Sequence, residues 1–189
     1  WAINFIKSDP HSVLYAHITG GKWKWMENPK TGESLYTFEK EEPKPDLVAI
    51  LRDVGVILLA EGKIHMRDLY DNNAEETMSK HAKIINKLSI ILKKNTKNWS
   101  NEDANSVVVP TLLWCAEANK KSTKNKREKL FNEFRSKLKI ANYNGPDIMV
   151  GLEVVRDQKM NLYTHHWVFG NKSQKTLSLN LQDHLDNLK

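Results

Sequence analysis

The feature that most constrains the fold is a nearly continuous apolar segment, residues 107–115, in the middle of the 189-residue chain. A strand with one face in water alternates apolar and polar side chains, whereas an unbroken apolar strand needs cover on both faces. Such cover comes from a layer of other elements on each side of the sheet. The segment therefore predicts the central strand of a covered sheet.

Two further apolar segments predict a β-hairpin before this strand. Residues 46–52 and 56–63 are rich in Val, Ile and Leu, and the turn-forming segment Asp53-Val54-Gly55 separates them. Pro43-Lys44-Pro45 marks the start of the hairpin. A shorter strand is expected earlier, at residues 34–39.

Helical periodicity is found on both sides of the central strand. Asn72 or Asn73 can cap a helix that continues to about residue 94. Its apolar stripe consists of Ile84, Ile85, Leu88, Ile91 and Leu92. A second helix is expected at residues 126–141, with its apolar face made of Leu130, Phe131, Phe134 and Leu138.

The last third of the chain predicts a second hairpin, residues 148–156 and 160–169, with Asp157-Gln158-Lys159 at the turn. Residues 177–188 predict a short terminal helix. Strands joined through helices imply a mixed sheet. We therefore expect residues 1–189 to form one α/β domain, a mixed sheet flanked by helices.

Composition favours a polyanionic partner. The formal net charge is +6, and Lys or Arg that neutralises phosphate releases counterions. Cys115 is the only cysteine, which excludes an intramolecular disulfide, and we expect a reducing, cytoplasmic location. No segment has the apolar length of a membrane span, so no membrane partner is expected. The chain shows no signal peptide and begins with Trp1 instead of Met, which suggests that its true N-terminus lies earlier; whether an N-terminal element precedes Trp1 stays open.

Two carboxylates and an ammonium group are expected at the open end of the first hairpin. Glu61 and Lys63 are two positions apart in a strand, so their side chains point to the same face. With the turn centred near Val54, Asp46 lies across from about Gly62 and beside Glu61 and Lys63. Cross-strand neighbours have Cβ atoms about 4.5–5.5 Å apart, and diagonal ones about 7–8 Å. The three charged groups therefore converge.

This set suits metal-assisted phosphodiester hydrolysis. Asp46 and Glu61 offer hard oxygen ligands to Mg²⁺, and the Gly62 carbonyl is a further candidate ligand. A bound Mg²⁺ polarises a phosphoryl oxygen and activates water, and Lys63 can offset charge that grows on the reacting phosphate. The alternative is an ordinary surface hairpin with a Glu61–Lys63 ion pair. Against it, the apolar residues 57–60 directly before Glu61 are typical of a buried strand, where two charges need a reason.

Pro45-Asp46, fourteen intervening residues and then Glu61-Gly62-Lys63 resemble the motif of the PD-(D/E)XK nuclease superfamily. The resemblance covers about residues 34–115, where a hairpin, a helix and a further strand follow in that family's order. It implies a restriction-endonuclease-like sheet and DNA cleavage with Mg²⁺, with Asp46, Glu61 and Lys63 as the catalytic residues. The chain departs from the family in showing no acid-bearing helix before the hairpin, for which Glu39, Glu41 and Glu42 are the candidate substitutes.

Within the superfamily, the chain is most similar to a type II restriction endonuclease. A catalytic core at about residues 34–118 is followed by a segment, about 119–170, that can enter a DNA groove. Such enzymes are commonly homodimers, since a two-fold protein matches a palindromic site, so we expect double-stranded DNA and a second copy as partners. The alternatives are a Holliday-junction resolvase or repair nuclease of the same superfamily, and a non-catalytic nucleic-acid-binding protein on this scaffold.

Cationic and aromatic side chains predict where DNA is contacted. Lysines suit phosphates, whereas arginine and histidine can also contact base edges. The expected DNA-binding residues are Lys120, Lys121, Lys124, Lys126, Arg127, Lys129, Arg156, His165 and His166. A second candidate surface has Trp23, Trp25 and Tyr36 among lysines, which either stack bases or cover an edge of the core.

The other candidate catalytic or metal-binding residues are weaker than the charged set of the first hairpin. Asp147 and Glu153 repeat part of the motif, but Val155 stands where its lysine is needed. His65 shares the face of Lys63 and can touch a phosphate, although a polar residue at a strand end is the simpler interpretation. His165 and His166 point to opposite faces of their strand, so they make a poor metal pair. Cys115 is expected in the core, and no nucleophilic triad, zinc cluster, P-loop or dinucleotide motif is present.

Overall fold

The computed structural model describes residues 14–19, 22–25, 46–51, 54–69, 74–94 and 107–186. Within these ranges, seven strands form one sheet in the order β2-β1-β3-β4-β5-β6-β7. The strands are β1 (Leu14–Thr19), β2 (Lys22–Trp25), β3 (Leu47–Leu51), β4 (Val56–His65), β5 (Val107–Glu117), β6 (Ile148–Arg156) and β7 (Leu162–Gly170). The helices are α2 (Ala74–Lys94), α4 (Lys124–Ile140) and α5 (Lys175–Asp186), with three short 3-10 helices η2 (Met66–Leu69), η4 (Ala118–Lys120) and η5 (Lys172–Gln174).

The sheet is mixed because helices connect its central strands. β4 pairs with β5, and β5 with β6, in parallel, and α2 and α4 lie on the two crossovers. The other neighbouring strands are antiparallel. In β5, the seven residues from Val108 to Trp114 are all buried. The predicted central strand and the α/β class are therefore confirmed.

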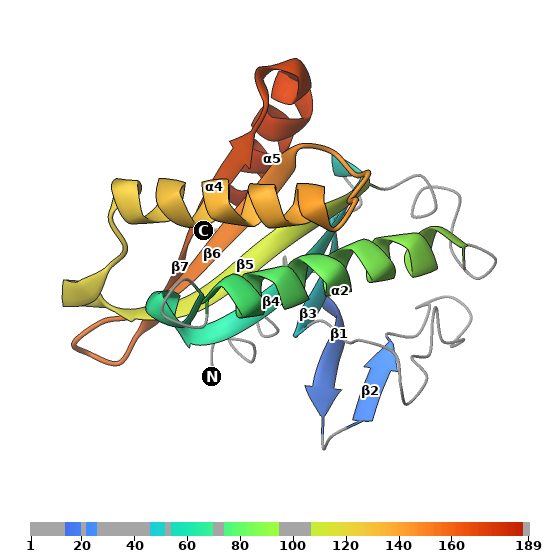
Figure 1. Ribbon diagram of the computed structural model, residues 1–189. Helices are drawn as coiled ribbons and strands as arrows, with labels where there is room; N and C mark the ends of the chain where they lie inside the picture. The colour runs from blue at the N-terminus through green and yellow to red at the C-terminus, as the bar shows by residue number, and fades with distance from the viewer. Residues whose placement is uncertain are drawn as a thin grey trace.

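Helices cover both faces of the sheet. Figure 1 shows α2 and α4 side by side across the front of β4–β7. They pack on side chains such as Ile57, Leu59 and Leu112. The opposite face carries a second core, in which Leu181 and Leu185 of α5 join Leu58 among others. Odd-numbered residues of β4 therefore face α2, and even-numbered ones face the α5 side. No helix in the described ranges combines the length and the apolar character that crossing a bilayer requires.

The predicted helices are present with small differences at their ends. α4 begins two residues earlier than expected, because Thr123 caps it and accepts a hydrogen bond from the Lys126 N–H (3.4 Å). Its four predicted core residues are all buried. In α2, Ile85 is buried and Ile84 packs against the core. The side chains of Leu88, Ile91 and Leu92, both candidate caps Asn72 and Asn73, and the predicted strand 34–39 lie outside the described residues.

The first hairpin is confirmed, but its predicted register is wrong by one residue. The ladder runs from Leu51↔Val56 to Leu47↔Ala60, so continuing it sets Asp46 level with Glu61 instead of Gly62. The turn needs a residue with positive φ, which Gly55 supplies at 62°. The ladder therefore sets the turn half a position earlier than the sequence suggested.

The second hairpin pairs β6 with β7 along their full length, from Arg156↔Leu162 to Ile148↔Gly170. β7 begins two residues later than predicted because Asp157 organises a longer turn. Its carboxylate accepts hydrogen bonds from the N–H groups of Lys159 and Asn161, both at 2.8 Å. Met160 then takes a positive φ of 64°. The terminal helix α5 begins at Lys175, two residues before the predicted start.

Candidate active site

The carboxyl end of β4 carries the first two charged groups. Glu61 and Lys63 follow Ile57 and Leu59 on the face that α2 covers. The Glu61 side chain is 13% exposed, and that of Lys63 is 37% exposed. Their closest charged atoms, Lys63 Nζ and Glu61 Oε1, are 3.8 Å apart. The strand thus brings a mostly buried carboxylate and a half-exposed ammonium group to one edge of the core.

Asp46 joins this edge from the start of β3. Its Oδ2 accepts a hydrogen bond from the Gly62 N–H at 2.7 Å. The carboxyl group thereby takes the place of a strand partner for Gly62, which lies two positions beyond Ala60, the last β4 residue of the β3–β4 ladder. In a strand, the N–H and C=O of one residue point to the same edge, so the Gly62 carbonyl also opens on the β3 side. The structure therefore brings Asp46, Glu61, Gly62 and Lys63 together.

The positive groups near Asp46 do not fully compensate for its burial and for the negative charge of Glu61. Burial raises the pKa of Asp46 above its usual value, and the negative charge of Glu61 raises it further. The Gly62 hydrogen bond, Lys63 and His81 oppose this shift without cancelling it. Two acids close enough to repel each other in a half-buried place favour any cation that can lie between them.

A fourth side chain, His81 of α2, completes the cluster. Its Nε2 is 3.0 Å from Glu61 Oε1, and the side chain is only 2% exposed. The sequence analysis did not identify this residue, because its partner Glu61 belongs to a different element. A signal was present, since Met78, Ala82 and Ile85 are buried on α2 at helical spacing and position 81 falls on the same stripe.

The donor set fits Mg²⁺ better than a softer metal. Among the described residues, no group of three or more His, Cys, Asp and Glu side chains is arranged to hold a metal ion. Mg²⁺ does not need such a cage, since it is typically held by one or two carboxylates together with waters and substrate phosphate. Within the part of the chain that the structure describes, Oδ1 of Asp46 and Oε2 of Glu61 accept no hydrogen bond. Each carboxylate thus has one oxygen left for a cation.

Some predicted DNA-binding residues share the face of this cluster. The strand registers align Lys63 with Trp114, Trp114 with Glu153, and Glu153 with His165. This row crosses three strand spacings, about 14 Å. His165 lies between Tyr163 and Trp167, with ring centroids 5.2 and 6.0 Å away. Lys121 lies over the Tyr163 ring, 5.1 Å from its centroid.

Two of the predicted base-contacting residues lie on the other face. His166 contacts Asp186 of α5 at 2.9 Å, and its side chain is 7% exposed. Arg156 pairs with Glu117 at the end of the second core face. The predicted opposition of His165 and His166 is confirmed. Arg156 and His166 are thus on the α5 side, away from Glu61 and Lys63.

Arg127 is also held within the fold. Its guanidinium lies 3.8 Å from the centroid of the Trp167 ring and donates to the Ser122 carbonyl at 2.6 Å. The other predicted cations of this segment, by contrast, are exposed at the start of α4 and in η4: Lys120, Lys121, Lys124, Lys126 and Lys129. This lysine cluster gives the predicted recognition segment a group of solvent-exposed cations.

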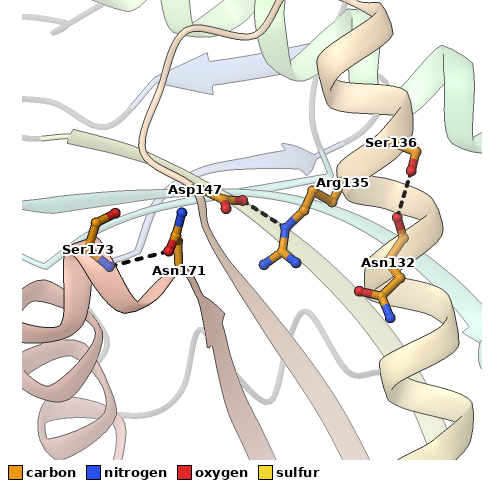
Figure 2. A network of polar contacts seen from close by, with 6 residues as sticks. All are labelled: Asn132, Arg135, Ser136, Asp147, Asn171 and Ser173. Atoms are coloured by element: carbon orange, nitrogen blue, oxygen red, sulfur yellow. Dashed lines mark hydrogen bonds and ion pairs between the residues drawn. The ribbon is translucent and has the colours of Figure 1, made fainter.

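The second, partial copy of the motif has a structural role. Figure 2 shows Asp147 turned toward Arg135 of α4, whose Nε donates to its carboxylate at 2.8 Å. Glu153 is buried, where it accepts hydrogen bonds from Trp114 Nε1 and the Ser122 N–H, both at 2.8 Å. The two acids fasten opposite ends of the α4 region to the sheet, which gives each of them a structural role.

The remaining candidates are Cys115 and residues whose side chains the structure does not describe. Cys115, expected in the core, is only half-buried, and burial raises the pKa of its thiol. The His65 side chain lies outside the described residues, as do Tyr36, Glu39, Glu41, Glu42 and the side chains of Trp23 and Trp25. No family model, curated protein or solved structure matches this chain.

Proposed function

We propose that this chain is a Mg²⁺-dependent endonuclease that hydrolyses phosphodiester bonds in double-stranded DNA. The observation that carries the proposal is the convergence of Asp46, Glu61 and Lys63 at the end of β4, on the two arms of one hairpin. A buried pair of acids with a cation beside it is costly to assemble for stability alone. The site also lies at the carboxyl ends of parallel strands, which is where open α/β sheets commonly bind ligands.

Each residue has a distinct role in the proposed reaction. Asp46 and Glu61 would hold the cation, and the Gly62 carbonyl would be a third candidate ligand. Mg²⁺ supplies Lewis-acid activation of the phosphate and of a water molecule. Lys63, with its ammonium group half in solvent, can orient that water or stabilise negative charge that develops on the phosphate. The exposed lysine cluster on the same side then binds the flanking phosphates.

The first experiment is a plasmid nicking assay with and without Mg²⁺. We expect the wild-type protein to cleave only with Mg²⁺ or Mn²⁺. Asp46→Asn and Glu61→Gln should abolish cleavage yet still bind DNA, because each removes negative charge near the phosphates. Asp183→Asn, which changes an exposed carboxylate on α5, is the matched control and should cleave normally. Cleavage that persists in chelator, or that survives both active-site substitutions, would sink the proposal.

Among nucleases, we favour a type II restriction endonuclease that acts as a cytoplasmic homodimer. The basic segment after the central strand supports this choice, since it supplies exposed cations on the face of the candidate active site. The alternative is a Holliday-junction resolvase or repair nuclease. Discrete fragments from long duplex DNA would indicate a restriction endonuclease. Cleavage confined to branched DNA would indicate a resolvase or repair nuclease. A protein that binds DNA but never cuts it would instead be a non-catalytic binding module.

A further inference from the structure

Among the described residues, the imidazole of His81 contacts Glu61, one of the two carboxylates of the candidate site. A carboxylate can only accept hydrogen bonds, so at 3.0 Å the His81 Nε2 donates to Glu61 Oε1. Lys63 approaches the same oxygen from 3.8 Å. The donors thus gather on Oε1 and leave Oε2 as the oxygen directed to other partners. His81 thereby determines which oxygen of Glu61 remains for a cation.

Folding alone does not require a histidine at position 81. Its Nδ1 is buried without a hydrogen-bond partner in the described structure. Leaving a buried polar atom unpaired is unfavourable, typically by about 1–3 kcal/mol. The neighbours on this stripe, Met78, Ala82 and Ile85, are apolar and buried. An apolar side chain of similar size would therefore fill the position without an unpaired nitrogen, so the contact with Glu61 distinguishes histidine here.

We infer that His81 is a positioning residue that holds Glu61 in the orientation needed to bind the catalytic Mg²⁺. This inference rests on the proposed function. Groups that hydrogen-bond to a metal ligand fix its orientation, and their loss typically reduces metal affinity or activity about 10- to 100-fold. Because His81 belongs to α2, it also makes the geometry of the site depend on the docking of that helix on β4.

The experiment compares two substitutions of nearly equal size. His81→Gln keeps an N–H donor near the position of Nε2, whereas His81→Met fills the same space without one. We expect calorimetric titration with Mg²⁺ to show affinity about 10- to 100-fold weaker in the Met variant, with much of the loss restored in the Gln variant. His184 of α5, on the opposite face, provides the control, since H184Q and H184M should bind Mg²⁺ like the wild type. Equal affinity in H81Q and H81M would overturn the inference.

A double-mutant cycle tests the same inference by a second measurement. Because His81 acts through Glu61, H81M should change Mg²⁺ affinity little in an E61Q background. Full additivity of the two losses would show that His81 acts by another route. The outcomes also separate the two proposals. If Mg²⁺ binding depends on His81 but the wild-type protein cuts no DNA, the inference about His81 stands and the nuclease proposal is rejected. If the wild-type protein cuts DNA and the H81M variant binds Mg²⁺ with unchanged affinity, the nuclease proposal stands and the inference about His81 is rejected.

Discussion

At the scale of single residues, Lys63 and Asp46 belong to one site but differ in how well their charges are accommodated. Lys63 keeps a third of its side chain in solvent and reaches Glu61 from its exposed side. Asp46 is held against the Gly62 N–H in a place where its charge is disfavoured. The lysine is free to respond to a substrate, whereas the carboxylate depends on a positive partner.

Removing the Lys63 ammonium group should therefore reduce the chemical step more than binding. We expect Lys63→Met to lower the single-turnover cleavage rate about 100- to 1,000-fold at saturating Mg²⁺, the range seen when one charge-stabilising group is lost. DNA affinity should change little, because one phosphate contact among many is affected. Lys87→Met, on the exposed side of α2, is the control. A K63M enzyme that cuts at the wild-type rate would remove Lys63 from the mechanism.

The raised pKa of Asp46 leads to a prediction about stability without metal. A carboxyl group whose pKa is higher in the folded state binds its proton more tightly there, so ionisation destabilises the fold. The stability of the metal-free protein should fall as pH rises from the ordinary value of 3.8 through the raised one, and then level off. Asp46→Asn removes this penalty and should raise Tm at neutral pH, on the order of a few degrees.

Thermal unfolding in chelator, followed across pH, measures this effect. The difference in Tm between D46N and the wild type should shrink below pH 3.8, where both side chains are neutral. Saturating Mg²⁺ should stabilise the wild type and not the variant, since a ligand that binds only the folded state raises its stability. A variant less stable than the wild type at neutral pH would show that the Asp46 charge supports the fold.

At the scale of elements, the sequence was informative where periodicity and turn residues agree. The apolar strand at β5, both hairpins and the stripe of α4 followed from such patterns, and the structure contains them. The exact register of the first hairpin did not, because it depends on how many residues the turn occupies, which the pattern does not determine. His81 was missed for another reason. Its partner Glu61 comes from β4, and a contact between a helix and a strand depends on how they pack.

The α4 segment depends on one buried acid. Glu153 accepts hydrogen bonds from Trp114 and from the Ser122 N–H just before the helix. We expect Glu153→Ala to destabilise the protein by about 2 kcal/mol or more, because it leaves buried donors without a partner. Glu128→Ala, which removes only an exposed ion pair with Lys124, should have no measurable effect. Denaturant unfolding monitors both. Equal stability of the two variants would mean that the buried bonds of Glu153 contribute nothing.

At the scale of the whole molecule, the two faces of the sheet differ in what they offer to DNA. The α2–α4 face carries Glu61, Lys63 and His165 and ends at the exposed lysine cluster. The opposite face is closed by α5, to which His166 is bound. The sequence predicts DNA contacts on both faces, because His165 and His166 alternate along one strand and the face that carries the active site depends on how the helices pack. A substrate held at Glu61 can reach the first set directly, so recognition should be one-sided.

Lysines on the two faces should therefore affect DNA binding differently. We compare Lys121→Ala/Lys124→Ala, at the start of α4, with Lys172→Ala/Lys175→Ala, at the start of α5; all four lysines are exposed. Each phosphate contact that is lost lowers the slope of log affinity against log salt concentration by about 0.9. The first double variant should bind all sequences more weakly and with a flatter slope, because phosphate contacts carry no sequence information. The second should match the wild type. The measurement is equilibrium binding of catalytically inactive D46N protein to cognate and mismatched duplexes across a salt series. If the α5 variant shows the flatter slope instead, DNA lies on the face opposite Glu61, and the proposed active site and the DNA-binding surface cannot serve one reaction.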